Sequence, residues 1–268
     1  MGKYWNIGKL ALKERLVYRG DFFLSTVLRF LPMVTSILLW KAVFGSASQD
    51  QLSGFSLNQV IAYLLLVHVS RMFSSMPGLA VNLARDIREG TIKKFLIQPL
   101  DLCTFLLSSR VAHKIAYIST SLIPYAGLFL ACLSFFDTFP SGLGWVYYFI
   151  SLALGFLVGF YFELCIGMIG FWFLEVTSLL YVVTTLSFFL SGHLIPLDFL
   201  DQTGWVEALK ALPFSYMAYF PAALFLGKVP EGEIVGRLLL GIFWAIFFWG
   251  LSRVILHLGL KQYSAFGA

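Results

Sequence analysis

Long hydrophobic stretches, separated by shorter polar connections, run through this sequence. A helix needs roughly 20 apolar residues to cross about 30 Å of hydrocarbon, and several stretches have that length. Pro32 and Pro124 lie inside two of them and predict local kinks, because proline leaves a helix carbonyl without its donor. We therefore predict an all-α membrane protein with six transmembrane helices, at about residues 22–44, 59–80, 111–134, 144–170, 177–195 and 234–256.

Composition supports a lipid environment for most of the surface. Hydrophobic residues make up 59% of the 268 residues and charged residues only 12%, too few to coat a soluble domain. The three cysteines, Cys103, Cys132 and Cys165, are odd in number and lie in or beside apolar stretches. We expect them to be packing residues, with neither a disulfide framework nor a metal site.

Lys and Arg are distributed unevenly among the connections, which predicts the orientation. Cations gather before the first span and between the second and third spans, whereas the connections after the first, third and fifth spans are mainly acidic. Both termini are therefore placed in the cytoplasm. Residues 1–20 mix cations with aromatic and aliphatic side chains, which is typical of an interfacial helix. Residues 21–268 then form a single transmembrane domain.

Two segments do not fit a simple loop or a simple span. Residues 85–97 predict a short charged cytoplasmic helix, broken by Gly90 and stopped by Pro99; an ordinary solvated loop is the alternative. Residues 196–226 lie outside and are largely apolar, yet they carry three prolines and several charges. This second segment favours a hairpin of two short helices that dips into the outer leaflet.

Two charges fall inside predicted spans, where an ionised side chain is costly unless it faces protein or water. These are Arg71 and Glu163. Gly155, Gly159, Glu163 and Gly167 recur at intervals of four and therefore share one helix face, which lets another backbone approach closely. Glu163 either contacts a substrate or coupling ion, or forms a buried hydrogen bond or a salt bridge with Arg71 or a neighbouring helix. The structural interpretation is favoured.

Familiar catalytic motifs are missing from the sequence. It has no phosphate-binding Gly-x-x-x-x-Gly-Lys-Ser/Thr loop, no His-Glu-x-x-His and no Gly-x-Ser-x-Gly. The spacing of the four histidines, His68, His113, His193 and His257, does not place two of them as metal ligands on one helix face. We predict no catalytic residue, no metal and no cofactor in this chain.

The predicted order of elements resembles the permease subunit of ABC exporters of the ABC-two class, also called type V exporters. Arg88-Glu89-Gly90-Thr91, followed by Leu96 and Pro99, is similar to the family's pattern around its coupling helix. Gly192, Pro196, Pro213 and Tyr216 are similar to landmarks of its external hairpin. Residues 260–267 resemble the ending of bacterial permeases, which implies the bacterial plasma (inner) membrane.

This resemblance implies a second permease chain, identical or homologous, and a pair of cytoplasmic ATPase subunits that bind ATP and magnesium. The coupling segment at about 85–97 would fit a cleft on the ATPase, with its charges setting the orientation and Ile87, Ile92 and Phe95 as apolar anchors. The implied contact residues are Arg85, Asp86, Ile87, Arg88, Glu89, Gly90, Thr91, Ile92 and Phe95. An apolar, aromatic path favours an amphipathic or lipid-like substrate. Nucleic acid is not an expected partner.

A different transporter class is the alternative. An ion-coupled secondary transporter would use Glu163 and Arg71 directly and would need no ATPase. Such folds usually carry internal repeats with interrupted helices in matched positions, and the two halves of this sequence show no convincing repeat. A copurifying ATP-binding subunit would separate the two classes.

Overall fold

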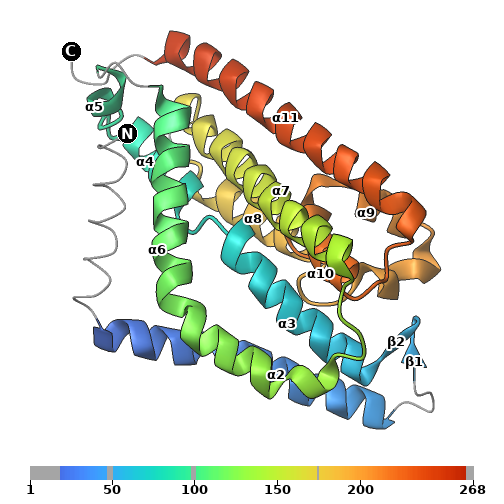
Figure 1. Ribbon diagram of the computed structural model, residues 1–268. Helices are drawn as coiled ribbons and strands as arrows, with labels where there is room; N and C mark the ends of the chain where they lie inside the picture. The colour runs from blue at the N-terminus through green and yellow to red at the C-terminus, as the bar shows by residue number, and fades with distance from the viewer. Residues whose placement is uncertain (1–18, 47–50, 98–100, 174, 264–268) are drawn as a thin grey trace.

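The computed structural model describes residues 19–46, 51–97, 101–173 and 175–263 and is predominantly helical (Figure 1). Residues 1–18 of the predicted interfacial helix, the predicted stop at Pro99 and the last five residues lie outside the described residues. The first long helix, α2 (Arg19–Ser46), covers the first predicted span and continues through Pro32. The carbonyl of Pro32 accepts hydrogen bonds from the hydroxyls of Thr35 and Ser36.

A tight hairpin leads into the second span. Strands β1 (Gln51–Leu52) and β2 (Phe55–Ser56) pair antiparallel, and Ser53 and Gly54 both adopt positive φ between them, as a two-residue hairpin turn requires. Ser56 then caps α3 (Leu57–Ser74) in a capping box with Gln59. The second predicted span continues after a break at residues 75–78 into α4 (Leu79–Arg88), and α5 (Lys93–Leu96) follows.

The kink predicted at Pro124 is present in α6 (Leu102–Ala131). The helix bends by 54° between Leu102–Ser119 and Ser121–Ala131. The bend lies about one turn before Pro124, because proline has no N–H to donate to the carbonyl four residues earlier, at position 120. Beyond the bend, Tyr125 packs edge-on against Phe30 of α2, with ring centroids 5.3 Å apart. Figure 1 shows the second half of α6 running beside α2.

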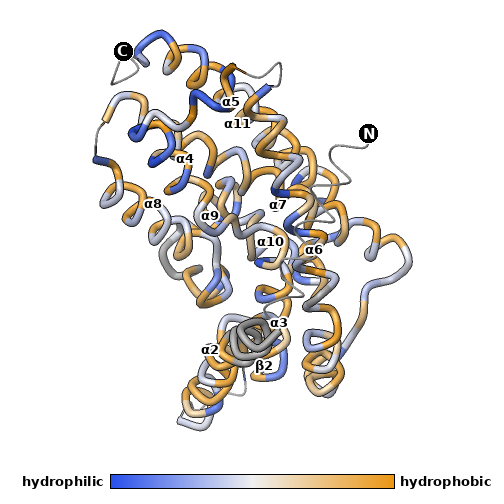
Figure 2. Tube along the Cα trace, turned by 90° about the vertical axis from the view of Figure 1, so that its left-hand side faces the viewer, coloured by the Kyte–Doolittle hydropathy of each residue, from blue (hydrophilic) through white to orange (hydrophobic). Residues whose placement is uncertain are grey.

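Helix α7 (Gly142–Gly167) is the centre of the bundle. It packs against α3, α4 and the last helix, α11 (Glu231–Gln262). Along the chain, the 3-10 turn η1 (Leu133–Phe135) precedes α7. The 3-10 turn η2 (Met168–Phe171) and the short helix α8 (Thr177–Leu190) follow it. Figure 2 shows hydrophilic residues gathered at the end of the bundle that holds α5 and the end of α11, with hydrophobic residues along the helices.

The predicted external hairpin contains four short helical pieces: η3 (Leu197–Thr203), α9 (Val206–Ala211), η4 (Pro213–Met217) and α10 (Tyr219–Phe225). All seven residues of α10 are buried, and the helix packs on α3 and α7. The apolar character of α10 is therefore explained by burial within the protein itself, whereas Trp205 of the same hairpin is 71% exposed. The dip of the hairpin into the outer leaflet stays a prediction.

Three helical runs of the described residues are long and apolar enough to cross a membrane, Leu57–Arg88, Gly142–Phe171 and Glu231–Gln262, and bent α6 makes four if it counts as one span. Phe30–Ser46 of α2 and Thr177–Leu190 (α8) are shorter apolar helices. At 1.5 Å per residue, the 14 residues of α8 reach only about 21 Å. The count of six spans stays a prediction.

Candidate functional site

The segment of residues 79–97, here called the charged segment, forms two helical pieces around a glycine turn. One face of α4 is buried: Leu79, Ala80, Leu83, Ala84 and Ile87. Arg85, Arg88 and Glu89 lie on the exposed side. Gly90 has φ +74°, a conformation that favours glycine, and so ends α4 and turns the chain toward α5. The predicted break at Gly90 is confirmed, and the segment is an ordered helical unit.

Asp86 and Thr91 hold this turn closed. The Thr91 hydroxyl donates to an Asp86 carboxylate oxygen at 2.8 Å, and the Ile92 N–H donates to the Asp86 carbonyl at 3.0 Å. Because these bonds tie the residues before Gly90 to those after it, the two halves of the charged segment are fixed relative to one another.

Two of the predicted apolar anchors point inward. Ile92 is 0% exposed and Ile87 is 3% exposed, and both belong to a hydrophobic cluster with Leu102, Leu164 and Phe171 of neighbouring elements. They attach the charged segment to α6, α7 and η2, so their side chains are not available to a partner surface. Phe95 is partly buried. Ile97, which the sequence analysis did not single out, is 83% exposed.

Ion pairs at this end link elements distant in sequence. Arg88 of α4 pairs with Glu175, just before α8, at 3.2 Å. Arg253 of α11 pairs with Asp101, the N-cap residue of α6. Partial desolvation raises the pKa of Asp101, but the hydrogen bonds from Arg253 and Thr104 outweigh it and hold the value below the usual range. One ion pair thus links the charged segment to the residues before α8, and the other links α11 to the start of α6.

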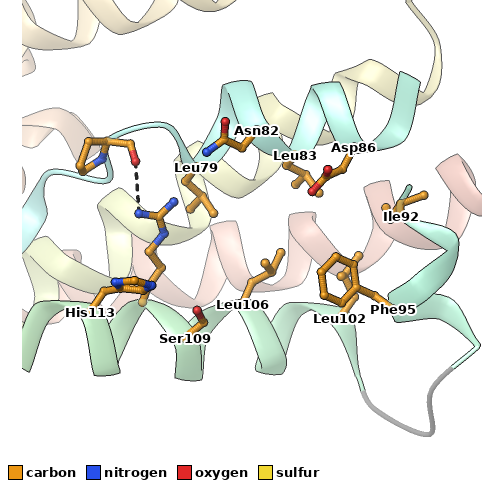
Figure 3. A pocket seen from close by; sticks show the side chains of 12 residues that line it. Leu79, Asn82, Leu83, Asp86, Ile92, Phe95, Leu102, Leu106, Ser109 and His113 are labelled. Atoms are coloured by element: carbon orange, nitrogen blue, oxygen red, sulfur yellow. Dashed lines mark hydrogen bonds between the residues drawn. The ribbon is translucent and has the colours of Figure 1, made fainter. Parts of the chain in front are cut away.

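A pocket of about 310 Å³ lies between the charged segment and the first half of α6 (Figure 3). The Arg110 side chain belongs to its lining and donates a hydrogen bond to the carbonyl of Pro77 at 3.2 Å. Because opposite walls belong to different elements, a shift of the charged segment relative to α6 would change the shape of the pocket. It is lined by Pro77, Leu79, Asn82, Leu83, Asp86, Ile92, Phe95, Leu102, Leu106, Ser109, Arg110 and His113.

Glu163 lies on the glycine-bearing face of α7, as the spacing predicted. A Cβ at Gly159 would lie 2.5 Å from the carbonyl oxygen of Ser74, and one at Gly167 would lie 2.8 Å from Cα of Ala80. Between these contacts, the Glu163 carboxylate lies close to the backbone N–H of Ala80 and is within electrostatic range of Arg110. The structural interpretation of Glu163 is therefore supported, with Arg110 as its ionic neighbour.

Arg71 does not pair with Glu163. Its guanidinium donates to Nε2 of His193 at 3.0 Å, and its Cζ lies 5.0 Å from the centre of the Phe188 ring. Within the described ranges, no acidic side chain forms an ion pair with Arg71. The two membrane charges that the sequence analysis considered together thus belong to separate clusters.

One comparison decides the family. A family model described as "ABC-2 family transporter protein" matches residues 30–267, which is most of the chain. This chain belongs to the ABC-2 transporter family. No curated protein matches it. Membership identifies an ABC-2 permease, a multi-pass membrane protein of a transporter.

In this ABC-2 permease, the landmarks of the predicted external hairpin lie where the chain returns into the core. Gly192 adopts φ +73°, and its carbonyl accepts a hydrogen bond from the buried hydroxyl of Tyr63 at 2.5 Å. Pro196 is buried where η3 begins, and Pro213 opens η4. Tyr216 is 1% exposed and donates from its hydroxyl to the carbonyl of Arg237 at 2.7 Å. These residues have structural contacts inside the chain.

A chain of ion pairs on the same hairpin was missed by the sequence analysis. Lys210 lies 2.9 Å from both Asp198 and Glu207, and Arg237 lies 3.0 Å from Glu207 and 2.8 Å from Glu233. The network ties α9 and η3 of the permease to the start of α11. The helical spacings of Glu207 with Lys210 and of Glu233 with Arg237 were readable signals, but the links between the two pairs required the fold.

The three cysteines of the permease, Cys103, Cys132 and Cys165, are free and buried. Their predicted role as packing residues is thus confirmed. No group of three or more potential metal ligands occurs in the part of the chain that the structure describes.

Proposed function

We propose that this chain is the membrane-spanning subunit of an ATP-driven exporter, in which the charged segment docks on a separate ATPase subunit. Two permease chains, identical or homologous, would form the path for an amphipathic or lipid-like substrate. ATP and magnesium would bind to the ATPase subunits. The chain would lie in the bacterial plasma membrane, with both termini in the cytoplasm.

One observation carries the proposal: an exposed charged rim is built on a buried apolar base. Arg85, Arg88 and Glu89 face outward, whereas Ile87 and Ile92 fasten the same segment to the bundle. A displacement of these exposed residues by a bound partner would therefore be transmitted to α6 and α7 through the buried isoleucines. Ile97 replaces the two buried isoleucines as the exposed apolar contact that we propose for the ATPase, since such contacts provide much of an interface's binding energy.

The first experiment tests the partnership. The tagged full-length chain is purified from native membranes in mild detergent, and bound ATP-hydrolysing subunits are quantified. A stoichiometric ATPase whose activity depends on the permease supports the proposal. A chain that transports without any ATPase would favour the ion-coupled alternative, although Arg71 and Glu163 do not form an ion pair in this fold.

The second experiment tests the docking segment. The double variant Arg88→Glu/Glu89→Lys reverses the charge pattern and should uncouple transport from ATP hydrolysis. Arg88→Glu also breaks the bridge to Glu175, so Glu175→Gln, which removes the bridge but leaves the exposed rim unchanged, is the matched control. Full stimulated ATPase activity and transport in the double variant would refute docking through this segment.

A further inference from the structure

We infer that Arg71 binds the anionic headgroup of an amphipathic substrate, and that His193 holds its guanidinium in position. This inference rests on the proposed transport function and specifies the substrate class. It follows from the charge, hydrogen bonding and surroundings of a cluster that joins α3 to the residues after α8.

The charge of Arg71 is not compensated by an acid within the described residues. The residue lies in the last turn of α3, inside the predicted second span at residues 59–80. Arg253 and Arg237, by contrast, each form an ion pair with an acidic side chain. A guanidinium at this depth is costly without a counter-charge, and an anionic ligand would supply one.

The hydrogen bonds of the cluster specify what the ligand must offer. Arginine has only donors, so Nε2 of His193 accepts from Arg71 and the imidazole is neutral, with its proton on Nδ1. That Nδ1 is buried, and no protein group in the described ranges accepts from it. The pair therefore has N–H donors and no free acceptor, and only its Arg71 end is partly exposed. Phosphate and carboxylate oxygens are the complementary acceptors.

The guanidinium is held in place and is still reachable. Its Cζ stacks 5.0 Å from the Phe188 ring centre, and that ring lies 4.2 Å from the His193 ring. Arg71 is only partly buried. Its neighbour Phe188 belongs to α8, which is largely apolar. A cation beside an apolar surface suits an anionic amphiphile better than a small soluble anion.

Binding is tested on the purified full-length chain in neutral detergent, without ATP or ATPase. Fluorescent phosphatidylglycerol is the probe, and unlabelled phosphatidylglycerol, phosphatidylcholine and inorganic phosphate are the competitors. For the native chain, phosphatidylglycerol should compete at about tenfold lower concentration than phosphatidylcholine, the effect of one charge-assisted hydrogen bond. Arg71→Met should remove this preference, and Arg71→Lys should retain part of it. Arg253→Met, at an arginine already paired with an acid, is the control.

Three results would overturn the inference: an unchanged headgroup preference in Arg71→Met, equal loss of preference in Arg253→Met, or competition by inorganic phosphate as strong as that by phosphatidylglycerol. Thermal unfolding excludes a folding artefact, since removal of an uncompensated charge should leave the melting temperature unchanged or raise it. A lower melting temperature with intact preference would make Arg71 a structural residue. Because no ATPase takes part, a negative result leaves the proposed transport function untouched.

Discussion

Gly159 of α7 packs directly on the carbonyl oxygen of Ser74, where a Cβ would approach to 2.5 Å. The neighbouring Ser74 hydroxyl donates to the carbonyl of Met217 at 2.7 Å. The end of α3, the centre of α7 and the end of η4 therefore meet at one point. This contact depends on a residue without a side chain.

Gly159→Ala should destabilise the fold by about 1–3 kcal/mol, because backbone atoms must move to admit the methyl group. Thermal unfolding in detergent measures the effect. Gly250→Ala is the control, since nothing lies within 4 Å of a Cβ at Gly250 on α11. Equal melting temperatures for the two variants would show that α3 and α7 do not pack this closely.

Ile92→Ala should cost about 2–4 kcal/mol, because it opens a cavity under the charged segment where Ile92 is fully buried. Ile97→Ala should cost almost nothing, since that side chain is 83% exposed. Limited proteolysis at Lys93 and Lys94 gives a local measurement alongside thermal unfolding. Faster cleavage is expected only in Ile92→Ala. Faster cleavage in Ile97→Ala than in Ile92→Ala would show that Ile97, and not Ile92, faces the bundle.

Tyr63→Phe should destabilise the permease by about 1–2 kcal/mol, because the carbonyl of Gly192 loses its buried donor. Tyr181→Phe is the control, since Tyr181 is 74% exposed. Hydrogen exchange should also quicken around Gly192 and the start of η3. A Tyr63→Phe variant as stable as the native chain would contradict the role given to this hydrogen bond.

The ion network of Asp198, Glu207, Lys210, Glu233 and Arg237 should lose strength in acid. The hydrogen bond from Lys210 holds the pKa of Glu207 below its usual value of 4.5, helped by Arg237 and opposed by partial desolvation. A lowered folded pKa means that the stabilisation is complete above the unfolded value and is lost as the pH falls through the folded value.

Glu207→Gln should therefore lower the melting temperature at pH 7, and the difference from the native chain should shrink below about pH 4.5. Glu231→Gln is the control, since Glu231 forms no ion pair among the described residues. A melting difference that does not change with pH would remove Glu207 from the network. Added salt should also reduce the effect at pH 7.

The sequence alone determined the broad character of this protein. Long apolar runs require helices in lipid, Pro124 predicted the bend of α6, and Gly90 predicted the turn that ends α4. The four-residue spacing of Gly155, Gly159, Glu163 and Gly167 predicted a close-packed face. These features are local, because they depend on backbone chemistry and helical periodicity.

Only the tertiary structure decided which distant groups meet. It turned Ile87 and Ile92 inward, paired Arg71 with His193 and not with Glu163, and buried α10 inside the bundle. The sequence of an apolar helix does not show whether lipid or protein covers it. The partner of a buried charge is likewise set by how helices pack across gaps of a hundred residues or more, which no local pattern specifies.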